Sequence, residues 1–276
     1  YTSIVQHFKK NKGATIILAN TIKGKGFSYF ESTNFKKNMH FYPYHSGNLP
    51  EDLYKKASKE ILNKIQKYCY SKKINLPKVK NYNFLNKSLR NNLLFSLVKV
   101  YAEELLVFAK KNKNVIVLDA DLAKDAGSYE VMLKLPKQFI EFGIAEQDMV
   151  SFGSGLSAKK FLPIFHSFSC FLSTRSQEQI FNFCSENRKG IFLGALSGLI
   201  PSGPGHSHQM IRDIPLIGSM PNMLILELFS RSMIKKFFIY QKTIKKSLFI
   251  KLNNSMLTHK NFEKLTLPKA GNFLKL

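Results

Sequence analysis

Apolar residues recur along the chain in short runs that are separated by polar, helix-like segments. The first run, residues 14–19, is almost uninterrupted and predicts a buried parallel strand that ends in the glycine-rich loop at residues 20–26. A helix is predicted at residues 51–68, and the lysine- and asparagine-rich stretch at 71–87 is typical of a connector. This connector is the best place for a domain boundary.

From Ser88 onward, strand-like and helix-like segments alternate regularly. Such alternation favours an α/β fold, a mostly parallel sheet with helices on both faces. Residues 88–254 therefore predict one complete α/β domain, preceded by a partial domain segment, and both ends look like parts of something larger. The predicted strands lie at 114–118, near Phe139, and at 161–165, 190–196, 222–228 and 247–252; the predicted helices lie at 88–110, near Asp148, at 174–187 and near Arg231.

Composition changes this picture little. The chain has 276 residues, 44% of them hydrophobic, a formal net charge of +24 and three cysteines. The charge comes mostly from lysines scattered in short pairs without a nucleic-acid-reading motif, so dedicated nucleic-acid binding is not expected. The scattered cysteines exclude a disulfide framework, and we expect them to be reduced and buried. The absence of a long apolar run and of a signal-peptide pattern predicts a cytoplasmic protein without membrane contact.

Polar clusters follow four of the predicted strands. Functional side chains of a parallel sheet gather at the carboxyl ends of its strands, so these clusters are expected to lie close together. Glycine and proline at high density in the last cluster permit a tight loop against a ligand. The clusters are Asp119 with Asp121, Glu146, His166 with Ser167, and the loop at residues 197–209, which contains His206 and His208.

Each cluster also has a purely structural interpretation. Glu146 begins a helix-like segment, where a carboxylate offsets the helix dipole, and the acidic pair after the first strand can cap a helix. The two histidines can belong to a surface turn, or to a zinc site with a carboxylate, although no further ligands have suitable spacing. Phe165, Phe168 and Phe171 have a near-helical spacing typical of a core, but a ring facing a cleft offers a stacking surface. An acid, histidines and rings without a visible electrophile suit an enzyme whose reactive centre is a bound cofactor.

Six segments, taken together, resemble the transketolase family of thiamine-diphosphate enzymes. One segment is similar to the end of that family's diphosphate-binding domain, and five are similar to its pyrimidine-binding domain and occur in the family's order. The segments are ILANTIKGKGFSYFE (17–31), then DADLAKDAGSY (119–129), FIEFGIAEQDMV (139–150), PIFHSFSCFLSTRSQEQI (163–180), GALSGLIPSGPGHSHQMIRDI (194–214) and MPNMLIL (220–226). The resemblance implies a thiamine-diphosphate-binding fold.

The same resemblance divides the chain. Residues 1–35 would be the C-terminal remnant of the diphosphate-binding domain, and 36–87 a helical and loop linker. Residues 88–254 would be the pyrimidine-binding domain, followed at 255–276 by a linker toward a third domain.

Cofactor contacts are implied for five residues. Glu146 would hydrogen-bond the pyrimidine ring of thiamine diphosphate and so drive the proton transfer that activates the cofactor. Phe168 would stack on that ring, with Phe165 and Phe171 shaping its pocket. Asp121 would lie near the cofactor across a dimer interface.

Substrate contacts are implied for three residues. His208 matches a histidine that contacts sugar hydroxyls, His45 in YHSGNLP matches a substrate histidine, and Arg90 matches a substrate-phosphate arginine. The implied catalytic set is then Glu146, His208 and His45, and the substrates are sugar phosphates. The family's Gly-Asp-Gly metal motif is absent, so the ligands of the cofactor's Mg²⁺ are expected outside this chain.

The implied activity is the transfer of a two-carbon ketol unit between sugar phosphates, by a homodimer or together with a complementary N-terminal subunit. Two alternatives stay open. A relative such as 1-deoxyxylulose-5-phosphate synthase uses the same glutamate, although His208 followed by Gln209 favours ketol transfer. A non-catalytic interaction module would keep the fold without the chemistry.

Overall fold

Six strands form one parallel sheet in the larger part of the chain. The structure is a computed structural model, and it describes residues 13, 20–32, 42, 44, 49–77, 96–199 and 205–253. All neighbouring strands run parallel, in the order β2-β1-β3-β4-β6-β5. The strands are β1 (Val115–Asp119), β2 (Phe139–Glu141), β3 (Leu162–Phe168), β4 (Ile191–Ala195), β5 (Met223–Leu228) and β6 (Ser247–Leu252).

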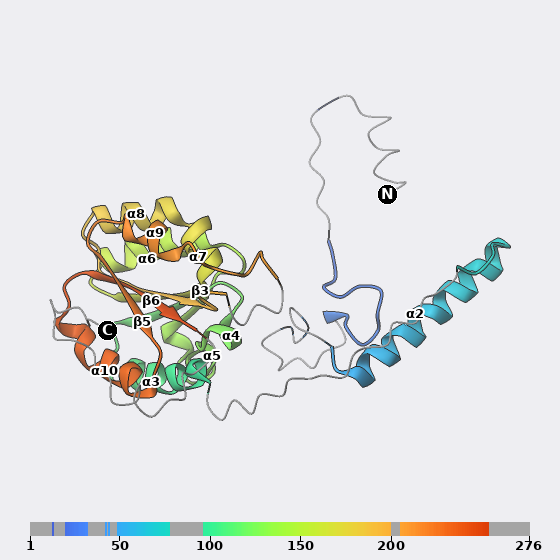
Figure 1. The fold of residues 1–276 in the computed structure, drawn as a ribbon, viewed down its shortest axis with the longest axis horizontal. Coiled ribbons are helices and arrows are strands. Elements are labelled where there is room, and N and C mark those ends of the chain that lie inside the picture. Colours follow the sequence, from blue (N-terminus) through green and yellow to red (C-terminus); the bar gives the residue numbers. More distant parts are fainter. Residues whose placement is uncertain are drawn as a thin grey trace. The chain divides into compact units, whose positions relative to one another are not determined.

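Helices cover both faces of this sheet (Figure 1). One face packs against α3, α4, α5 and α10, and the other against α6, α7, α8 and α9. Parallel sheets need such cover because their strands are apolar on both sides. The helices are α3 (Leu97–Lys111), α4 (Ala123–Ala126), α5 (Tyr129–Lys134), α6 (Glu146–Ala158), α7 (Ser169–Arg175), α8 (Gln177–Ser185), α9 (Asp213–Gly218) and α10 (Arg231–Tyr240), with single turns η2 (Pro136–Gln138) and η3 (Gln241–Thr243).

The first core lies between the sheet and α3. This helix buries Leu97, Tyr101, Leu105 and Phe108, which recur at helical spacing and form one apolar stripe. The last turn of α3 carries two lysines, which interact favourably with the negative end of the helix dipole. Sequence pattern and charge therefore both favour a helix that ends near residue 111.

The second core lies on the opposite face of the sheet and is built around three phenylalanines. Phe165, Phe192 and Phe249 are partners in register on β3, β4 and β6, and all three are fully buried. The rings of Phe165 and Phe192 stack with centroids 4.4 Å apart and an angle of 13° between planes. Helix α6 approaches this stack at Gly153, where an added Cβ would overlap the ring of Phe165. The close packing of α6 on the sheet therefore requires glycine at this position.

Residues before 86 form a separate compact unit, Tyr1–Leu85. Its described helix is α2 (Glu51–Lys72), which follows Pro50 and has Glu51 and Asp52 in its first turn. Proline fits just before a helix, and acidic residues stabilise its N-terminus. The helix ends at Lys73 in the left-handed conformation, with φ 53°. The predicted helix at 51–68 is thus confirmed and is one turn longer.

The parallel sheet with helices on both faces confirms the predicted fold class. The three cysteines are free and buried, as expected. The strand predicted at 14–19 and the N-terminal part of the helix predicted at 88–110 lie outside the described residues. The structure divides the chain into two compact units, Tyr1–Leu85 and Asn86–Leu276. The domain limits predicted at residues 35, 87 and 254 stay a prediction.

Two predicted elements were wrong in detail. The strand predicted at 161–165 extends to Phe168, so His166 and Ser167 lie inside β3 and not after it. The helix predicted at 174–187 is two helices that meet at Ser176, which has φ −107° and ψ 25°. The Ser176 hydroxyl donates to the carbonyl of Leu172 at 2.7 Å, a bond that competes with regular helix geometry. Helices α4, α5 and α9 were missed because four to six residues are too short to show a helical period.

Substitution of the two glycines of α6 tests the packing of this helix. Gly153→Ala is expected to lower the free energy of unfolding by about 1–3 kcal/mol, because the new methyl group overlaps Phe165. Gly155→Ala is the matched control: no atom lies within 4 Å of its added Cβ, and alanine favours helix by up to about 1 kcal/mol. Urea unfolding followed by circular dichroism measures both. Equal effects of the two substitutions would contradict the close contact at Gly153.

Candidate functional site

The helices that follow β1 and β3 cover opposite faces of the sheet: α4 lies with α3 and α5, and α7 lies with α6 and α8 (Figure 1). The two strands are neighbours, yet β1 leads to α4 on one face and β3 leads to α7 on the other. In parallel α/β sheets, ligands bind outside the carboxyl ends of the strands at such a point. The residues at this edge of the sheet are therefore the candidates for a functional site.

The Glu146 carboxylate is buried at this edge. Glu146 is the first residue of α6, and only 3% of its surface is exposed. Its Oε1 accepts a hydrogen bond of 2.7 Å from Nη1 of Arg175, the last residue of α7. A carboxylate offsets a helix dipole without being buried, whereas burial costs free energy unless the charge is paired. The burial of Glu146 and its ion pair with Arg175 are therefore more than is needed to offset a helix dipole.

Arg175 connects Glu146 to a cluster of rings. Its guanidinium carbon lies 3.9 Å from the ring centroid of Phe171. The Phe171 ring centroid is 5.0 Å from that of His208 and 5.8 Å from that of Phe168, and the centroids of Phe168 and His208 are 5.7 Å apart. Four predicted site residues, Glu146, Phe168, Phe171 and His208, thus lie in one continuous set of contacts that runs through Arg175. We call these five residues the ring cluster.

Arg175 is a residue of this site that no sequence pattern singled out. Its one signal was its position four residues after Phe171, because residues i and i+4 share a face of a helix. The ion pair with Glu146 joins positions 29 residues apart and depends on the fold. Such a pair is not visible in a local pattern.

The loop that carries His208 is closed at its base. Gly198 and Met210 exchange two backbone hydrogen bonds of 2.8 Å, and Gly198 adopts a φ of 86°, which favours glycine. Beyond this closure, the buried carboxylate of Asp213 accepts a hydrogen bond of 3.1 Å from the hydroxyl of Ser169, the first residue of α7. The loop is therefore fixed at one end to the helix that presents Phe171.

The two histidines of this loop differ in position. His208 contacts two phenylalanine rings, and its Nδ1 lies 2.9 Å from the hydroxyl of Ser207. His206 is exposed in a turn. Within the described residues, no group of three His, Cys, Asp or Glu side chains is placed to hold a metal ion.

Asp119 supports the loop after β1 from inside. It is fully buried, and its carboxylate accepts hydrogen bonds from the Ser128 hydroxyl at 2.5 Å and from the backbone N–H of Leu122 at 2.7 Å. Burial raises the pKa of Asp119 to about 8, from its usual 3.8. Leu122 directly precedes α4, so this residue matches the helix-cap interpretation of the acidic pair.

His166 is a buried, hydrogen-bonded core residue. Its Nδ1 lies 3.1 Å from the carbonyl oxygen of Ile164 and 3.3 Å from that of Leu118, so Nδ1 carries the hydrogen and donates it. Its Nε2 then accepts from the hydroxyl of Tyr101 at 3.0 Å. Burial lowers the pKa of His166 to about 4, from its usual 6.5. The imidazole is therefore neutral and ties β3 to α3.

Four other predicted site residues are not part of the ring cluster. Asp121 is exposed after β1 and adopts a left-handed backbone with φ 60°. Phe165 lies in the second core, because residues three apart on a strand point to opposite faces of the sheet. His45 and Arg90 lie outside the described residues.

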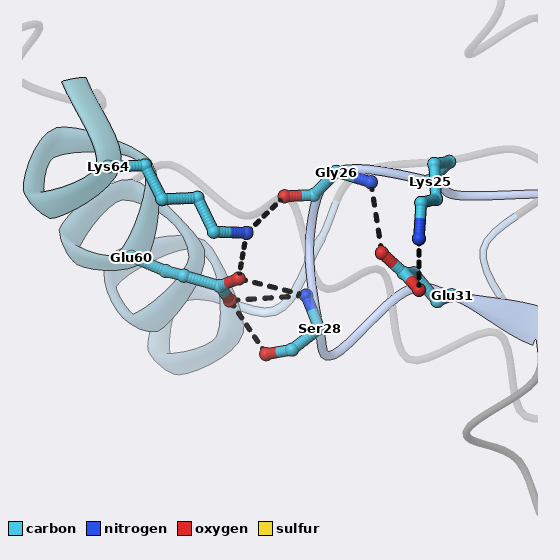
Figure 2. Close-up of polar contacts among 6 residues, drawn as sticks. All are labelled: Lys25, Gly26, Ser28, Glu31, Glu60 and Lys64. Atoms are coloured by element: carbon cyan, nitrogen blue, oxygen red, sulfur yellow. Dashed lines mark hydrogen bonds and ion pairs between the residues drawn. The ribbon is translucent and has the colours of Figure 1, made fainter. Parts of the chain in front are cut away.

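The glycine-rich loop of the first unit is bound to α2 by a network of polar contacts (Figure 2). The backbone N–H and the hydroxyl of Ser28 both donate to the Glu60 carboxylate, at 3.1 and 2.8 Å. Lys64 donates to the Gly26 carbonyl at 2.7 Å and pairs with Glu60 at 2.5 Å. The Lys64 ammonium and then Ser28 lower the pKa of Glu60 to about 2, from its usual 4.5. Side chains of α2 thus hold the loop in shape.

Residues 95–250 match the family described as transketolase, pyrimidine binding domain. The chain belongs to the transketolase family. Similar curated proteins include the 1-deoxy-D-xylulose-5-phosphate synthase of Clostridium acetobutylicum, 26% identical over 225 residues, which are 82% of this chain and 30% of that protein. A Methanocaldococcus jannaschii protein named as a transketolase C-terminal section is 33% identical over 129 residues, which are 46% of this chain and 41% of that protein. The chain thus spans less than half the length of these relatives.

Two solved structures share the fold of this transketolase-family domain. A split-gene transketolase, solved as an inactive tetramer of four beta subunits, superposes with a TM-score of 0.54 and 24% identity, over 63% of this chain and 56% of that one. The transketolase of Campylobacter jejuni gives a TM-score of 0.54 and 20% identity, over 74% of this chain and 32% of that one. Among the helices that the structure describes, none has both the length and the apolar character to cross a membrane.

Substitution of Arg175 tests the ion pair of this transketolase-family domain, in which the Glu146 carboxylate is buried and the Arg175 side chain is 42% exposed. Arg175→Met is expected to lower the free energy of unfolding by about 1–3 kcal/mol, because it leaves the Glu146 carboxylate buried without its ionic partner. Arg188→Met is the matched control: Arg188 is about as exposed as Arg175, but its partner Glu186, 3.1 Å away, is 55% exposed, and such pairs contribute about 0–1 kcal/mol. Chemical unfolding measures both, and equal small losses would contradict a structural role for the pair.

The neutral state of His166 predicts a pH dependence of stability. The pKa of His166 is about 4 in the folded state and 6.5 ordinarily, so between these values the unfolded chain binds more protons. The unfolding free energy contributed by this group is complete above pH 6.5 and falls as the pH decreases toward 4, by about 3 kcal/mol at most.

A comparison with His166→Gln isolates this contribution. The raised pKa of Asp119 acts in the opposite direction, since its ionisation destabilises the folded state as the pH rises from about 4 to about 8. This effect is common to both proteins and cancels in their difference. Urea midpoints measured from pH 7 to 4.5 should fall more steeply for the parent than for the variant. Parallel curves would mean that His166 is charged in the folded protein.

Proposed function

We propose that this chain supplies the pyrimidine-binding half of a thiamine-diphosphate site, and that the complete enzyme transfers two-carbon ketol units between sugar phosphates. The observation that carries the proposal is the buried Glu146 carboxylate, joined through Arg175 to the rings of Phe171, Phe168 and His208. An acid beside aromatic rings at the carboxyl ends of parallel strands suits a flat, nitrogen-containing ring.

The residues of the ring cluster fit such a cofactor. Arg175 binds Oε1 of Glu146, and within the described residues no hydrogen bond of Oε2 is found, so an acceptor oxygen is left for a ring donor. Phe168, which is 3% exposed in this structure, is proposed to stack on the cofactor ring once that ring is bound. The bound cofactor supplies the electron sink for the two-carbon unit.

The chain's own residues then have distinct roles. Glu146 holds and passes a proton at its carboxylate, as general acid and base. Arg175 keeps that carboxylate in place, and the burial of Glu146, which is 3% exposed, keeps water away from it. His208 is the proposed donor and acceptor for sugar hydroxyls, and His45 and Arg90 are proposed to bind the substrate from positions outside the described residues. Asp121 is proposed to lie near the cofactor across a dimer interface.

The proposed enzyme needs further protein. Mg²⁺ and the diphosphate require oxygen ligands in near-octahedral geometry, and we place these ligands outside this chain. The partner is either a second copy or a complementary subunit that carries the metal motif. The split-gene transketolase supports the second arrangement, because that protein is named as an inactive tetramer of one of its chains. The proposed location is the cytoplasm.

A second candidate function is 1-deoxyxylulose-5-phosphate synthesis. It is favoured by a relative of that name that matches 82% of this chain. Ketol transfer is favoured by the position of His208 in the ring cluster, followed by Gln209. Product analysis separates the two: the assembled enzyme is offered pyruvate or xylulose phosphate as donor. Consumption of pyruvate alone would replace ketol transfer by the second function.

Substitution of Glu146 tests the proposed function directly. Glu146→Gln preserves the size of the side chain but removes the proton-carrying oxygen, and is expected to lower the turnover rate of the assembled enzyme by about 10²–10⁴-fold. Arg175→Met is the comparison variant: it removes the same ion pair, and with it the positioning of the carboxylate, but it keeps the acid itself. Its turnover rate should fall by less than that of Glu146→Gln.

Calorimetric titration with thiamine diphosphate and Mg²⁺ completes the test. Binding is expected for this chain together with a segment that carries the metal motif, and not for this chain alone. Full activity of Glu146→Gln would contradict the role of that residue. Failure of the assembled pair to bind the cofactor would favour a non-catalytic interaction module.

A further inference from the structure

A cavity of about 460 Å³ lies at the edge of the sheet opposite to the ring cluster. Val115 and Leu162, which begin β1 and β3, form part of its wall, and Lys189 enters it two residues before β4. The ring cluster lies at the carboxyl ends of these strands, so the cavity is a separate site. Its lining residues are Phe108, Asn112, Asn114, Val115, Ser157, Lys160, Phe161, Leu162, Lys189, Gln241 and Lys242.

Three lysines from three different segments line this cavity. Lys160 follows α6, Lys189 precedes β4 and Lys242 lies in η3. The described residues that line the cavity include no carboxylate, and none of these lysines forms an ion pair within the described part of the chain. Three positive charges that line one cavity without a counter-charge attract an anion.

Lys189 is the most enclosed of the three. Its ammonium donates to the carbonyl oxygen of Gln241 at 3.4 Å, which is long for a hydrogen bond. Burial lowers the pKa of Lys189, because the charged form loses water without gaining a carboxylate. An anion in the cavity would provide the missing partner.

The remaining walls indicate an organic anion. Phe161, which is 39% exposed, and Leu162 supply apolar surface, with a small part of Phe108, and the volume lies in the range of about 300–1,000 Å³ that is usual for small-molecule sites. An inorganic ion fills only a fraction of this space. Several lysines suit a group that carries two negative charges, and a phosphate monoester is close to doubly charged at neutral pH.

We propose that this cavity binds a small organic phosphate monoester, with its phosphate between Lys160, Lys189 and Lys242 and its carbon skeleton against Phe108 and Phe161. The site is independent of the proposed cofactor site, because no residue is shared between the cavity and the ring cluster.

Substitution of Lys160 can separate an effect on binding from an effect on folding. It adopts a left-handed backbone with φ 66°, directly after the C-terminal end of α6, where glycine is the usual residue. Lys160→Gly therefore removes the ammonium and also relieves the backbone, so the melting temperature should stay equal or rise. A loss of binding in this variant is not a loss of folding.

Isothermal titration of the full chain at low ionic strength tests the proposal, with phenyl phosphate as the probe. Saturable binding is expected, tighter than binding of inorganic phosphate, which lacks the ring, or of phenol, which lacks the charge. Lys160→Gly and Lys189→Met should each weaken it about tenfold or more, the effect of losing one charged hydrogen bond. Lys246→Met is the control, because Lys246 is exposed and does not line the cavity.

Four results would overturn the proposal. One is the absence of saturable binding at about 10 mM probe, which excludes even a millimolar Kd. Another is an equal response to Lys246→Met and Lys160→Gly, which would reveal only the attraction of a basic protein for anions. The third is binding that is lost in Glu146→Gln but kept in Lys160→Gly, which would place the probe at the ring cluster. Tighter binding of a dicarboxylate such as succinate would replace the phosphate by a carboxylate ligand.

Discussion

The candidate site depends on the burial of one charge. A carboxylate removed from water costs several kcal/mol unless a partner compensates it, and Glu146 is compensated by Arg175 at 2.7 Å. This pair fixes the start of α6 relative to the end of α7. It also places the guanidinium over Phe171, and the contacts to His208 and Phe168 follow from that position. The ring cluster is therefore organised around a single ion pair between two helix termini.

Helix α6 must in turn be placed accurately for this pair to form. Its position on the sheet is determined by Gly153, whose missing side chain admits the ring of Phe165. A glycine inside a helix costs about 0.5–1 kcal/mol relative to alanine. This cost is offset by the packing of Phe165 on Phe192 and by the correct position of Glu146 two turns earlier. The same helix ends beside the lysine-lined cavity, so core, candidate site and cavity share one rigid element.

Much of this architecture follows from the pattern of apolar residues. The alternation of buried runs and helical stripes predicts the parallel sheet, and the Glu146 position at a strand-to-helix junction marks the edge of the sheet that is proposed to be functional. Strand β3 was predicted too short because His166 and Ser167 are polar, although His166 is buried with partners on α3 and β1. The break at Ser176 was missed because a serine does not interrupt helical periodicity. Arg175 was missed because its ion pair arises only when distant segments fold together.

Burial also decides which groups at this edge of the sheet carry charge. It raises the pKa of Asp119 to about 8 and lowers that of His166 to about 4, so both groups are mainly neutral at pH 7. The ion pair that contacts these rings, Glu146 with Arg175, joins two charges of opposite sign. An edge of this kind suits the flat, weakly polar part of a cofactor and not a diphosphate, which needs a metal ion and several donors. On the proposed function, one half of the site binds the flat ring of the cofactor and the other half binds its diphosphate and metal ion. This chain provides the first, apolar and acid-bearing half.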